Sequence, residues 1–262
     1  MEAVFTTQWM PRDGSQMGDY EDAFAPATAG KMAGRRLRFA VADGATESLL
    51  SGPWARLLVD TWVSAPRRSA GQLVGAARLE WDRQLAAYLG ARASSDRPVQ
   101  WYEEPGLARG AHATFVGFQL TSRRVVGASG KWSAVAAGDS CMFHLRGDGV
   151  IGAFPIEEAS AFDRTPDLLA SREPGPEPRS GPRRKVRLEA RFGEWRSGDV
   201  FLLATDAFAR WFLSCLHDGV PACELTRVTA YDRDEFARWV AARRSDRSLA
   251  NDDVTVVSVE CL

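Results

Sequence analysis

The chain has 262 residues, of which 45% are hydrophobic and 26% are charged, as in ordinary globular proteins. Lys and Arg total 33 and Asp and Glu total 34, so the net charge of −1 creates no overall field that favours nucleic acid or an anionic membrane. No basic segment followed by an apolar stretch opens the chain, and no apolar run is long enough to cross a bilayer. We therefore expect a cytoplasmic protein that forms one domain over residues 1–262 and binds neither nucleic acid nor membrane.

The cysteines do not have the spacing of a metal site. Cys141, Cys215, Cys223 and Cys261 lie far apart and form no Cys-x-x-Cys pair. This spacing favours buried free thiols. A disulfide between Cys215 and Cys223 is open on spacing alone, but a chain without a secretion signal does not favour it.

The first apolar runs predict a strand followed by two helices. Residues 37–42 are apolar at nearly every position, as expected of a strand covered on both faces, and they end at Asp43-Gly44. A helix is predicted from Pro53, because apolar residues then follow four apart: Trp54, Leu58 and Trp62. A second, longer helix that packs beside the first is predicted from the same step at Leu73, Ala77, Trp81, Leu85 and Leu89.

Beyond residue 110 the pattern changes to short apolar runs separated by turn residues, which is typical of consecutive antiparallel strands. We expect one meander formed by strands 113–120, 125–129, 132–137, 141–145 and 150–154, the last two joined in a hairpin around Gly147-Asp148-Gly149. An α+β fold is completed by strands 186–192, 200–205 and 254–259 and by helices 207–213 and 234–243, the second with Phe236, Trp239 and Val240 facing inward.

The segment 172–185 differs from the rest of the chain. Its four prolines, two glycines and alternating charges do not suit a helix or a sheet ladder. We favour a solvated connecting loop. The functional alternative is a flap that brings Arg183, Arg184 and Lys185 toward an anionic substrate.

Acidic residues recur where apolar runs stop. Asp43 and Asp206 each follow a strongly apolar strand, where an unpaired carboxylate is costly, and Asp252 precedes another strand. Carboxylates gathered at strand ends repel one another unless a cation lies among them, and oxygen-only ligands suit hard ions such as Mg²⁺ or Mn²⁺. We therefore expect Asp43, Asp206 and Asp252 to converge on a metal. Glu21-Asp22, Asp139 and Asp252-Asp253 have the alternative role of ordinary turn or capping residues.

Six segments follow one another along the chain: Glu21-Asp22-Ala23-Phe24, Phe39-Ala40-Val41-Ala42-Asp43-Gly44, Ala113-Thr114-Phe115, Gly138-Asp139-Ser140, Leu203-Ala204-Thr205-Asp206 and Asn251-Asp252-Asp253-Val254-Thr255. In order and spacing they resemble the metal-dependent protein phosphatases of type 2C, and most closely the divergent bacterial branch of that family. The resemblance runs from about residue 16 to the last residue, so it covers nearly the whole chain.

The resemblance implies a four-layer αββα sandwich, in which helices flank two central antiparallel sheets, with two Mg²⁺ or Mn²⁺ ions in a cleft at one end. By position, Asp43 would bridge the two ions and the Gly44 carbonyl would bind one of them. Asp206 and Asp252 would hold the other ion. Two further acids, Glu21 and Asp22, would act through water, and Asp139 would lie near a third, weaker metal position.

Three positions depart from the family pattern. Met17 stands where members usually carry an arginine that grips the substrate phosphate, and the nearest upstream arginine is Arg12. Ala45 replaces a histidine that is proposed to protonate the leaving group, and Arg210 replaces an acid that supports a third metal. The candidates for binding the phosphate are therefore Arg12, Arg210 and, in the proline-rich segment, Arg183.

These observations predict a metal-dependent serine/threonine protein phosphatase that uses a metal-activated water, with Asp22, Asp43, Asp206 and Asp252 as its catalytic residues. Its partner would be a phosphoprotein that a serine/threonine kinase modifies in bacterial signalling. Three alternatives stay open: a silent member that serves as a regulatory or binding module, a hydrolase of another phosphoester such as a nucleotide, and a purely structural interaction domain.

Overall fold

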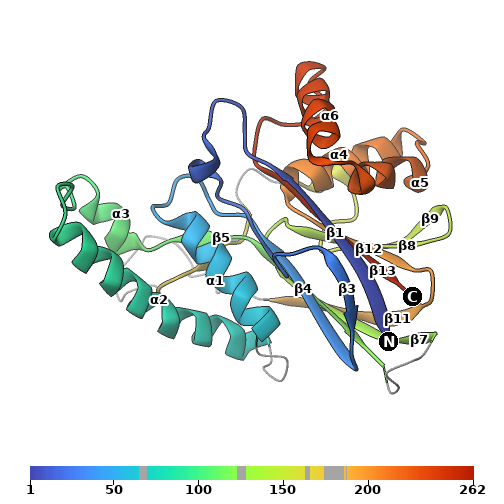
Figure 1. Ribbon diagram of the computed structural model, residues 1–262, viewed down its shortest axis with the longest axis horizontal. Coiled ribbons are helices and arrows are strands. Elements are labelled where there is room, and N and C mark those ends of the chain that lie inside the picture. The colour runs from blue at the N-terminus through green and yellow to red at the C-terminus, as the bar shows by residue number, and fades with distance from the viewer. Residues whose placement is uncertain (65–69, 123–127, 163–165, 174–185, 187) are drawn as a thin grey trace.

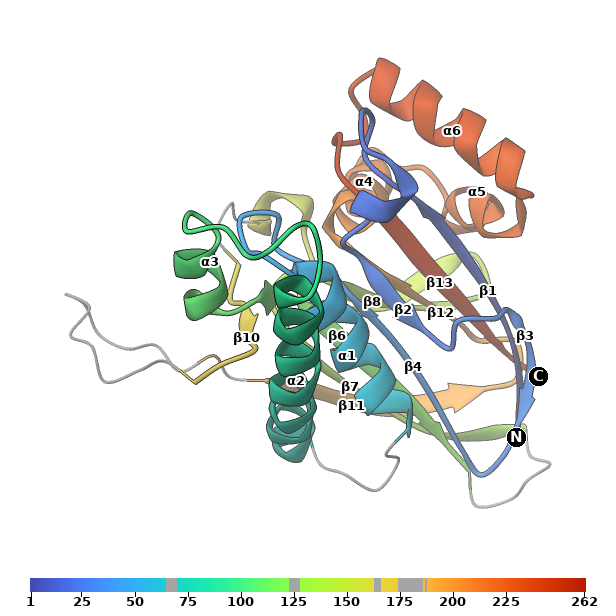
Figure 2. The ribbon, with the colours of Figure 1, turned by 60° about the vertical axis from the view of Figure 1, so that its left-hand side comes forward.

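Two antiparallel sheets lie face to face in the centre of the molecule (Figures 1 and 2). The computed structural model describes residues 1–262 except 65–69, 123–127, 163–165, 174–185 and 187. One sheet has the order β3 (Gly30–Ala33), β1 (Glu2–Met10), β13 (Val254–Cys261), β12 (Val200–Ala204), β8 (Cys141–Arg146) and β9 (Gly149–Phe154). The other has the order β11 (Glu189–Arg196), β7 (Ser129–Ala137), β6 (Phe115–Thr121), β4 (Arg36–Ala42) and β2 (Ala23–Ala25). A short third ladder pairs β10 (Leu169–Ala170) with β5 (His112–Ala113).

Helices cover the outer face of each sheet, so the molecule has the expected αββα layers (Figure 2). The five-stranded sheet packs against α1 (Ser51–Ser64) and α2 (Ala70–Ala93). The six-stranded sheet packs against α4 (Asp206–His217), α5 (Ala222–Leu225) and α6 (Arg233–Ser245). The remaining helical segments are α3 (Glu104–Arg109) and the 3₁₀ turns η1 (Met17–Asp19), η2 (Ala159–Ala161) and η3 (Thr226–Ala230).

Strand β4 is apolar at consecutive positions because it is buried on both faces. Phe39 and Val41 point into the core between the sheets, whereas Ala40 and Ala42 face the helices. The small alanines leave room for α1 to approach the sheet closely. The one charged residue within this buried stretch, Arg38, is satisfied by the carbonyl of Trp62 at 2.9 Å and lies over the Trp62 ring at 4.0 Å. The strand predicted from this run is therefore confirmed, and it ends beside Asp43.

Helix α2 follows its predicted pattern except at its far end. Leu73, Ala77, Trp81 and Leu85 are buried, but Leu89 is 36% exposed. An α-helix has 3.6 residues per turn. Residues spaced exactly four apart therefore shift gradually around the helix and leave the buried face after several turns. The prediction that the first two helices pack side by side is confirmed by the edge-to-face contact of Trp54 with Trp81.

The expected meander is wrong. Strands β6 and β7 belong to the five-stranded sheet, whereas β8 and β9 belong to the six-stranded sheet. The chain crosses between the sheets at Gly138-Asp139-Ser140, where Gly138 has a φ of +84°. Hydrophobic periodicity identifies strands but does not say which sheet a strand joins. The predicted strand 125–129 falls largely outside the described residues, and β7 begins at Ser129.

Other local expectations need correction. Cys223 is exposed and Cys215 is half-buried, and both are free thiols, so neither a buried Cys223 nor a Cys215–Cys223 disulfide is found. Strand β11 begins at Glu189, later than predicted, and its Phe192 is 74% exposed. Trp239 in α6 is only half-buried. Most of the proline-rich segment, including Arg183, lies outside the described residues.

Strand β1 has no counterpart in the sequence predictions. It pairs with β13 from Ala3–Cys261 to Met10–Val254 and joins β3 to the sheet. Its polar residues Thr6, Thr7 and Gln8 obscure the alternation of buried Ala3 and Phe5. In the described part of the chain, no helix has the length and apolarity that a bilayer crossing requires.

A buried ionic cluster fixes the turn before β12. Asp199 accepts bonds from Arg146 at 2.7 and 2.8 Å, from the Arg196 amide at 2.9 Å and contacts His144 Nε2 at 2.9 Å. Burial acts to raise the pKa of Asp199, but the hydrogen bonds outweigh it and lower that pKa to about 2. Because the folded-state pKa is depressed, this cluster stabilises the fold above about pH 4 and loses its effect as the pH falls toward 2.

We expect Asp199→Ala to lower the free energy of unfolding by about 3 kcal/mol, because Arg146 and His144 lose a buried partner. Urea unfolding at neutral pH measures this loss. Asp148→Ala, in the exposed turn between β8 and β9, is the matched control and should change stability by less than about 0.5 kcal/mol. Equal stability of the two variants at neutral pH would contradict the stabilising role of the Asp199 cluster.

Candidate metal centre

A pocket of about 750 Å³ brings together acidic residues from distant parts of the sequence. Its lining includes Asp43, Asp139, Asp206 and Asp252, together with Gly44. These residues follow β4, connect β7 to β8, begin α4 and precede β13, so both sheets contribute to the pocket. Four of the acids expected at a metal site therefore lie around one space.

The loop after β4 is held tightly in place. The Thr114 amide donates to the Asp43 carbonyl at 2.8 Å, and Gly44 forms an antiparallel bridge with Ala113. A Cβ atom at Gly44 would lie 2.7 Å from the Glu21 carbonyl oxygen and 2.8 Å from the carbonyl carbon of Ser51. Only glycine allows this approach, which places Glu21 directly beside the Asp43 loop.

Asp206 is positioned by the packing of α4. The buried side chains of Ala207, Phe208 and Phe212 hold this helix on the six-stranded sheet, and Phe212 lies 4.8 Å from the Phe143 ring. The helix therefore begins at the pocket. Asp206 Oδ1 accepts a hydrogen bond from the Ala207 amide at 2.6 Å, a favourable place for a negative charge because the N-terminus of a helix is electropositive.

Asp22 is buried deeper than the pocket wall. Its Oδ2 accepts bonds from the hydroxyl of Thr205 at 2.9 Å and from that of Thr255 at 2.6 Å. Its Oδ1 is buried and has no hydrogen-bond partner among the described residues. Thr205 directly follows β12, and Thr255 lies at the start of β13. Asp22 therefore connects the segments that carry Asp206 and Asp252. Both threonines lie in the acidic segments noted in the sequence, but the sequence predictions gave neither of them a role.

Asp253 has a positioning role that the sequence predictions missed. It accepts the Arg12 amide at 2.8 Å and the Glu21 amide at 2.7 Å. One carboxylate thus fixes both the end of β1 and the segment that carries Glu21 and Asp22. Its acidic neighbour Asp252 was a visible signal, since the two residues are adjacent in the sequence.

The carboxylates raise one another's pKa. Burial raises the pKa of Asp43, and repulsion from Asp22, Asp206, Asp252 and Asp139 raises it further. Burial and repulsion from Asp139 and Asp252 raise the pKa of Asp206 to about 7. Burial is also the main cause of the raised pKa of Asp22 and of Asp252, and Asp253 adds repulsion in both cases. Such a group is stabilised by protons or by a cation.

The ligand types of these residues suit a hard divalent ion. The acids offer only oxygen ligands, they repel one another, and Asp22 Oδ1 is buried without a partner in the described structure. As their side chains are placed, no three acidic, histidine or cysteine groups in the described ranges meet closely enough to hold one ion. Asp206 and Asp252 each turn one oxygen toward the amide of the following residue, at 2.6 and 2.9 Å. Metal binding would therefore require the acidic groups to move closer together.

The basic residues expected near the site differ in position. Arg210 lines the pocket beside Asp206, and Arg109 of α3 lines it as well. Arg12 donates to the Thr46 hydroxyl at 3.1 Å and lies 3.9 Å from Glu21, at the edge of the pocket. Met17 is exposed and contacts Arg233 of α6 instead. Arg109 was not predicted, because the polar stretch before β5 gave no sign of its position.

Two further residues border the acids. Ala45 lines the pocket at the position of the missing histidine, while His112 of β5 lines the same space. Cys141 is buried behind the pocket, and its thiol donates to the Asp139 carbonyl at 3.1 Å. Burial raises the pKa of this thiol well above its ordinary value. A larger hollow of about 920 Å³ lies beside β9, η2 and α4, away from this set of acids.

The pKa shifts predict how the metal-free protein responds to pH. Because the folded pKa of Asp206 is raised, the folded state binds protons that the unfolded state has released, so stability falls as the pH rises through about 7. We expect the midpoint of thermal unfolding to rise when the pH is lowered from about 8 to about 6 in the presence of a chelator. Added Mn²⁺ should raise the midpoint more at the higher pH, since it replaces protons among the carboxylates.

Asp206→Asn is the control for this experiment, because it removes one titrating carboxylate and should reduce both the pH dependence and the response to Mn²⁺. Equal behaviour of the variant and the parent chain would show that Asp206 does not contribute to ion binding.

Known structures share this architecture, although the sequence matches no protein-family model and no curated protein. The Mycobacterium tuberculosis serine/threonine phosphatase PstP/Ppp superposes with a TM-score of 0.55 and 16% identity, covering 100% of this chain and 99% of that chain. RsbX in complex with magnesium gives a TM-score of 0.54 and 12% identity, over 99% of this chain and 95% of that chain. PppA of Pseudomonas aeruginosa, described as a key regulatory component of T6SS, gives 0.55 and 18%, over 99% and 100%.

These identities are low, and the similarity extends over whole chains rather than over one motif. The sandwich, its covering helices and the order of the acidic segments agree with the resemblance noted in the sequence. The chain therefore has the fold of the metal-dependent protein phosphatases of type 2C.

Proposed function

We propose that this protein is a Mg²⁺- or Mn²⁺-dependent phosphatase that hydrolyses phosphoserine or phosphothreonine in proteins. The observation that carries the proposal is the gathering of four aspartates, from four separate parts of the sequence, around one pocket. The raised pKa values of Asp43, Asp206 and Asp252 support this proposal, because repulsion among carboxylates contributes to each of them and divalent cations would neutralise that charge. The fold shared with serine/threonine phosphatases supports the same reaction class.

Each acidic residue has a proposed task in this reaction. Asp43 would contact two ions, the Gly44 carbonyl would contact one, and Asp206 with Asp252 would hold the other. Glu21 is kept beside the Asp43 loop by the Ser51 hydroxyl, so it would orient ordered water there. Asp22 would do the same from its buried position. Bound divalent ions would supply the nucleophilic water and neutralise charge on the phosphate.

The basic residues would bind the substrate phosphate. Arg210 lies in the pocket, and Arg12 is fixed at its edge by bonds to Ser15 and Thr46. A guanidinium group can form two parallel hydrogen bonds to a phosphate, which fixes the direction of attack as well as the charge. His112 is the proposed donor of a proton to the leaving alkoxide, since Ala45 has no such group.

The central test is Mn²⁺-dependent release of phosphate from p-nitrophenyl phosphate and from phosphothreonine peptides. We expect Asp206→Asn to lower kcat roughly 100-fold or more, because a metal ligand contributes several kcal/mol of transition-state stabilisation. Asp148→Asn, the same change in an exposed turn, should retain the parent rate. The proposal fails if Mn²⁺ gives no rate above that of the Asp206→Asn variant.

A second test concerns the phosphate. We expect Arg12→Met and Arg210→Met each to raise KM for p-nitrophenyl phosphate and to weaken inhibition by inorganic phosphate, about tenfold, because each removes a charged hydrogen-bond donor. Arg83→Met on the exposed side of α2 is the matched control. Unchanged phosphate inhibition in both pocket variants would assign phosphate binding to other residues, with Arg109 the first to examine.

A second candidate function is a regulatory or binding module that has the phosphatase fold without the activity. Two observations favour it: Met17, at the position of the family's arginine, contacts Arg233 of α6, and one oxygen of Asp206 and of Asp252 accepts a hydrogen bond from the following amide. Such a module would gain thermal stability from Mn²⁺ and release no phosphate. A nucleotide hydrolase would instead prefer nucleotides to phosphopeptides in the same assay.

A further inference from the structure

The turn before α3 presents two aromatic side chains to solvent. Trp101 is 79% exposed and Tyr102 is 65% exposed, and their rings meet edge to face at 5.9 Å. Trp101 has the largest exposed fraction of any large apolar side chain among the described residues. Exposed aromatic side chains of this size are typical of binding surfaces, since burying them against a partner removes a large apolar area from water.

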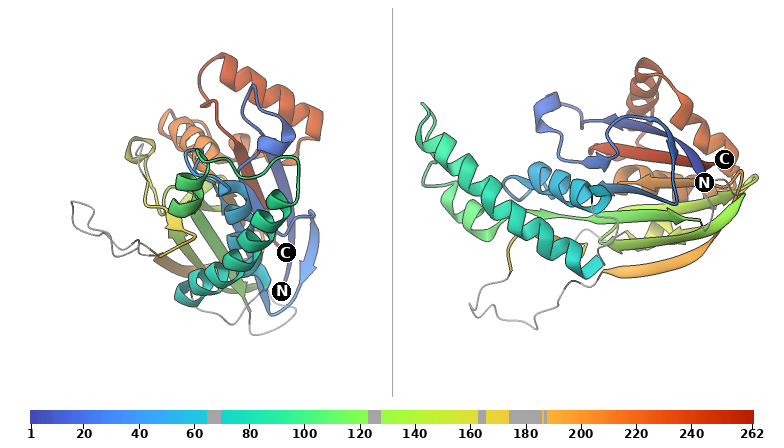
Figure 3. Two further views of the ribbon diagram at one scale, coloured as in Figure 1. Left: turned by 90° about the vertical axis from the view of Figure 1, so that its left-hand side faces the viewer. Right: turned by 60° about the horizontal axis from the view of Figure 1, so that its bottom comes forward.

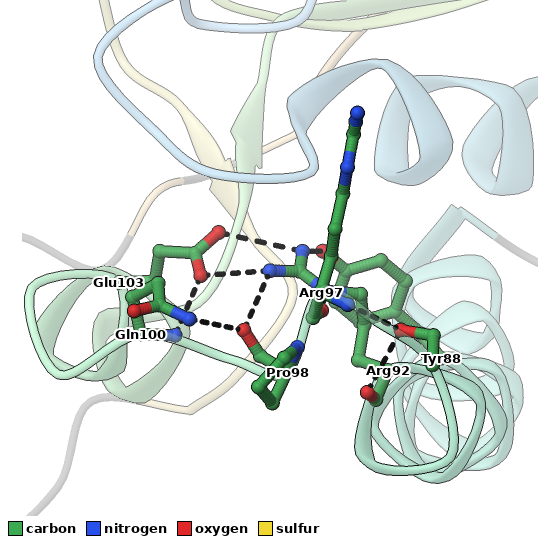
Figure 4. A network of polar contacts seen from close by, with 7 residues as sticks. Tyr88, Arg92, Arg97, Pro98, Gln100 and Glu103 are labelled. Carbon is green, nitrogen blue, oxygen red and sulfur yellow. Dashed lines mark hydrogen bonds and ion pairs between the residues drawn. The ribbon is translucent and has the colours of Figure 1, made fainter.

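A network centred on Arg92 keeps this turn in one conformation (Figure 4). Arg92 donates to Glu103 at 2.9 Å, to the Pro98 carbonyl at 3.2 Å and to the Arg97 carbonyl. Glu103 also accepts the Gln100 amide at 2.7 Å. Arg92 of α2 thus forms hydrogen bonds with both ends of the segment 97–103. The aromatic pair is therefore held out to solvent by a preorganised turn, which lowers the entropy cost of binding.

Helix α3 connects the aromatic pair to the acidic pocket. The pair lies just before the helix, while Gly106, Arg109 and Gly110 line the pocket. The helix is fixed against the loop after Asp43, because a Cβ atom at Gly106 would lie 2.7 Å from Leu49 Cδ1. Helix α3 lies beside one end of α2, at the left-hand end of the molecule in Figure 1 and in the right-hand view of Figure 3. The aromatic pair therefore precedes, and the pocket-lining residues Arg109 and Gly110 end, one six-residue helix.

We propose that Trp101 and Tyr102 form a docking site for the polypeptide segment that flanks the phosphorylated residue of the substrate. This inference rests on the proposed function. The six residues of α3 span about 9 Å, and the preceding turn adds a few ångströms to the distance between the aromatic pair and the pocket. An extended peptide advances about 3.3 Å per residue, so the pair would meet a side chain roughly three to five residues from the phosphorylated position.

The geometry favours an extended polypeptide as the occupant. A small phosphoester that fills the pocket does not reach beyond α3, whereas a peptide does. The turn offers two aromatic faces, and the charged side chains that hold it, Arg92 and Glu103, are paired with each other. The favoured flanking side chain is therefore apolar, such as Leu or Phe, rather than acidic or basic.

The experiment compares peptides that carry one phosphothreonine and one leucine in an otherwise polar sequence, with the leucine moved from one to seven residues away on either side. In the parent chain, a leucine three to five residues away on one side should lower KM about tenfold, with kcat unchanged. The double variant Trp101→Ala, Tyr102→Ala should lose this preference and keep the parent rate on p-nitrophenyl phosphate. Phe192→Ala, an equally exposed aromatic on β11, should keep the preference.

Each outcome separates the two proposals. No Mn²⁺-dependent cleavage of p-nitrophenyl phosphate by the parent chain refutes the proposed function itself. Cleavage of that compound, with the same KM for every leucine position or with the preference intact in the double variant, refutes the docking site. Loss of self-association in the double variant, measured by light scattering over a range of protein concentrations, would instead assign the aromatic pair to contact between copies of the chain. An unchanged melting temperature verifies that the variants fold.

Discussion

The fold holds several like-charged carboxylates close together at one end of the sandwich. This arrangement costs free energy, since burial and mutual repulsion both disfavour the charged forms of Asp43 and Asp206. The surrounding structure opposes that cost. Packing of β4 and α4, together with hydrogen bonds from the Thr114 and Ala207 amides, holds the two aspartates, and the hydroxyls of Thr205 and Thr255 hold Asp22. A cation bound among these carboxylates would offset the repulsion between them.

The sequence predicts this architecture well where burial determines the pattern. The run at 37–42 is apolar throughout because both of its faces are covered, and the helix with Trp54 on one face is amphipathic because only one face is covered. It predicts the architecture poorly where pairing depends on distant contacts. Strand β1 is stabilised by β13 and β3 rather than by its own pattern, and the crossing at Gly138 changes sheets without a change in periodicity.

For the candidate site, the order of motifs in the sequence identifies the acidic residues but not the residues that hold them in position. Asp43, Asp206 and Asp252 are visible because each borders an apolar strand, and all three line one pocket, while their convergence on a metal stays a prediction. The position of Asp253 beside Asp252 is visible in the sequence, but its bonds to the Arg12 and Glu21 amides are not, and Arg109 resembles an ordinary surface residue until the fold brings it to the pocket. Orientation is also beyond the sequence, since local hydrogen bonds to backbone amides determine where a carboxylate points in the absence of a ligand.

The thiol behind the pocket has a consequence for redox chemistry. The Cys141 thiol donates a hydrogen bond to the Asp139 carbonyl, and burial raises its pKa, which favours the protonated form at neutral pH. Peroxides and disulfides react with the thiolate form, so this cysteine is a poor target for them despite lying next to Asp139. The acidic pocket thus combines carboxylates with a thiol that resists oxidation. Its side chains would stay chemically unchanged under oxidising conditions that inactivate enzymes with a reactive cysteine.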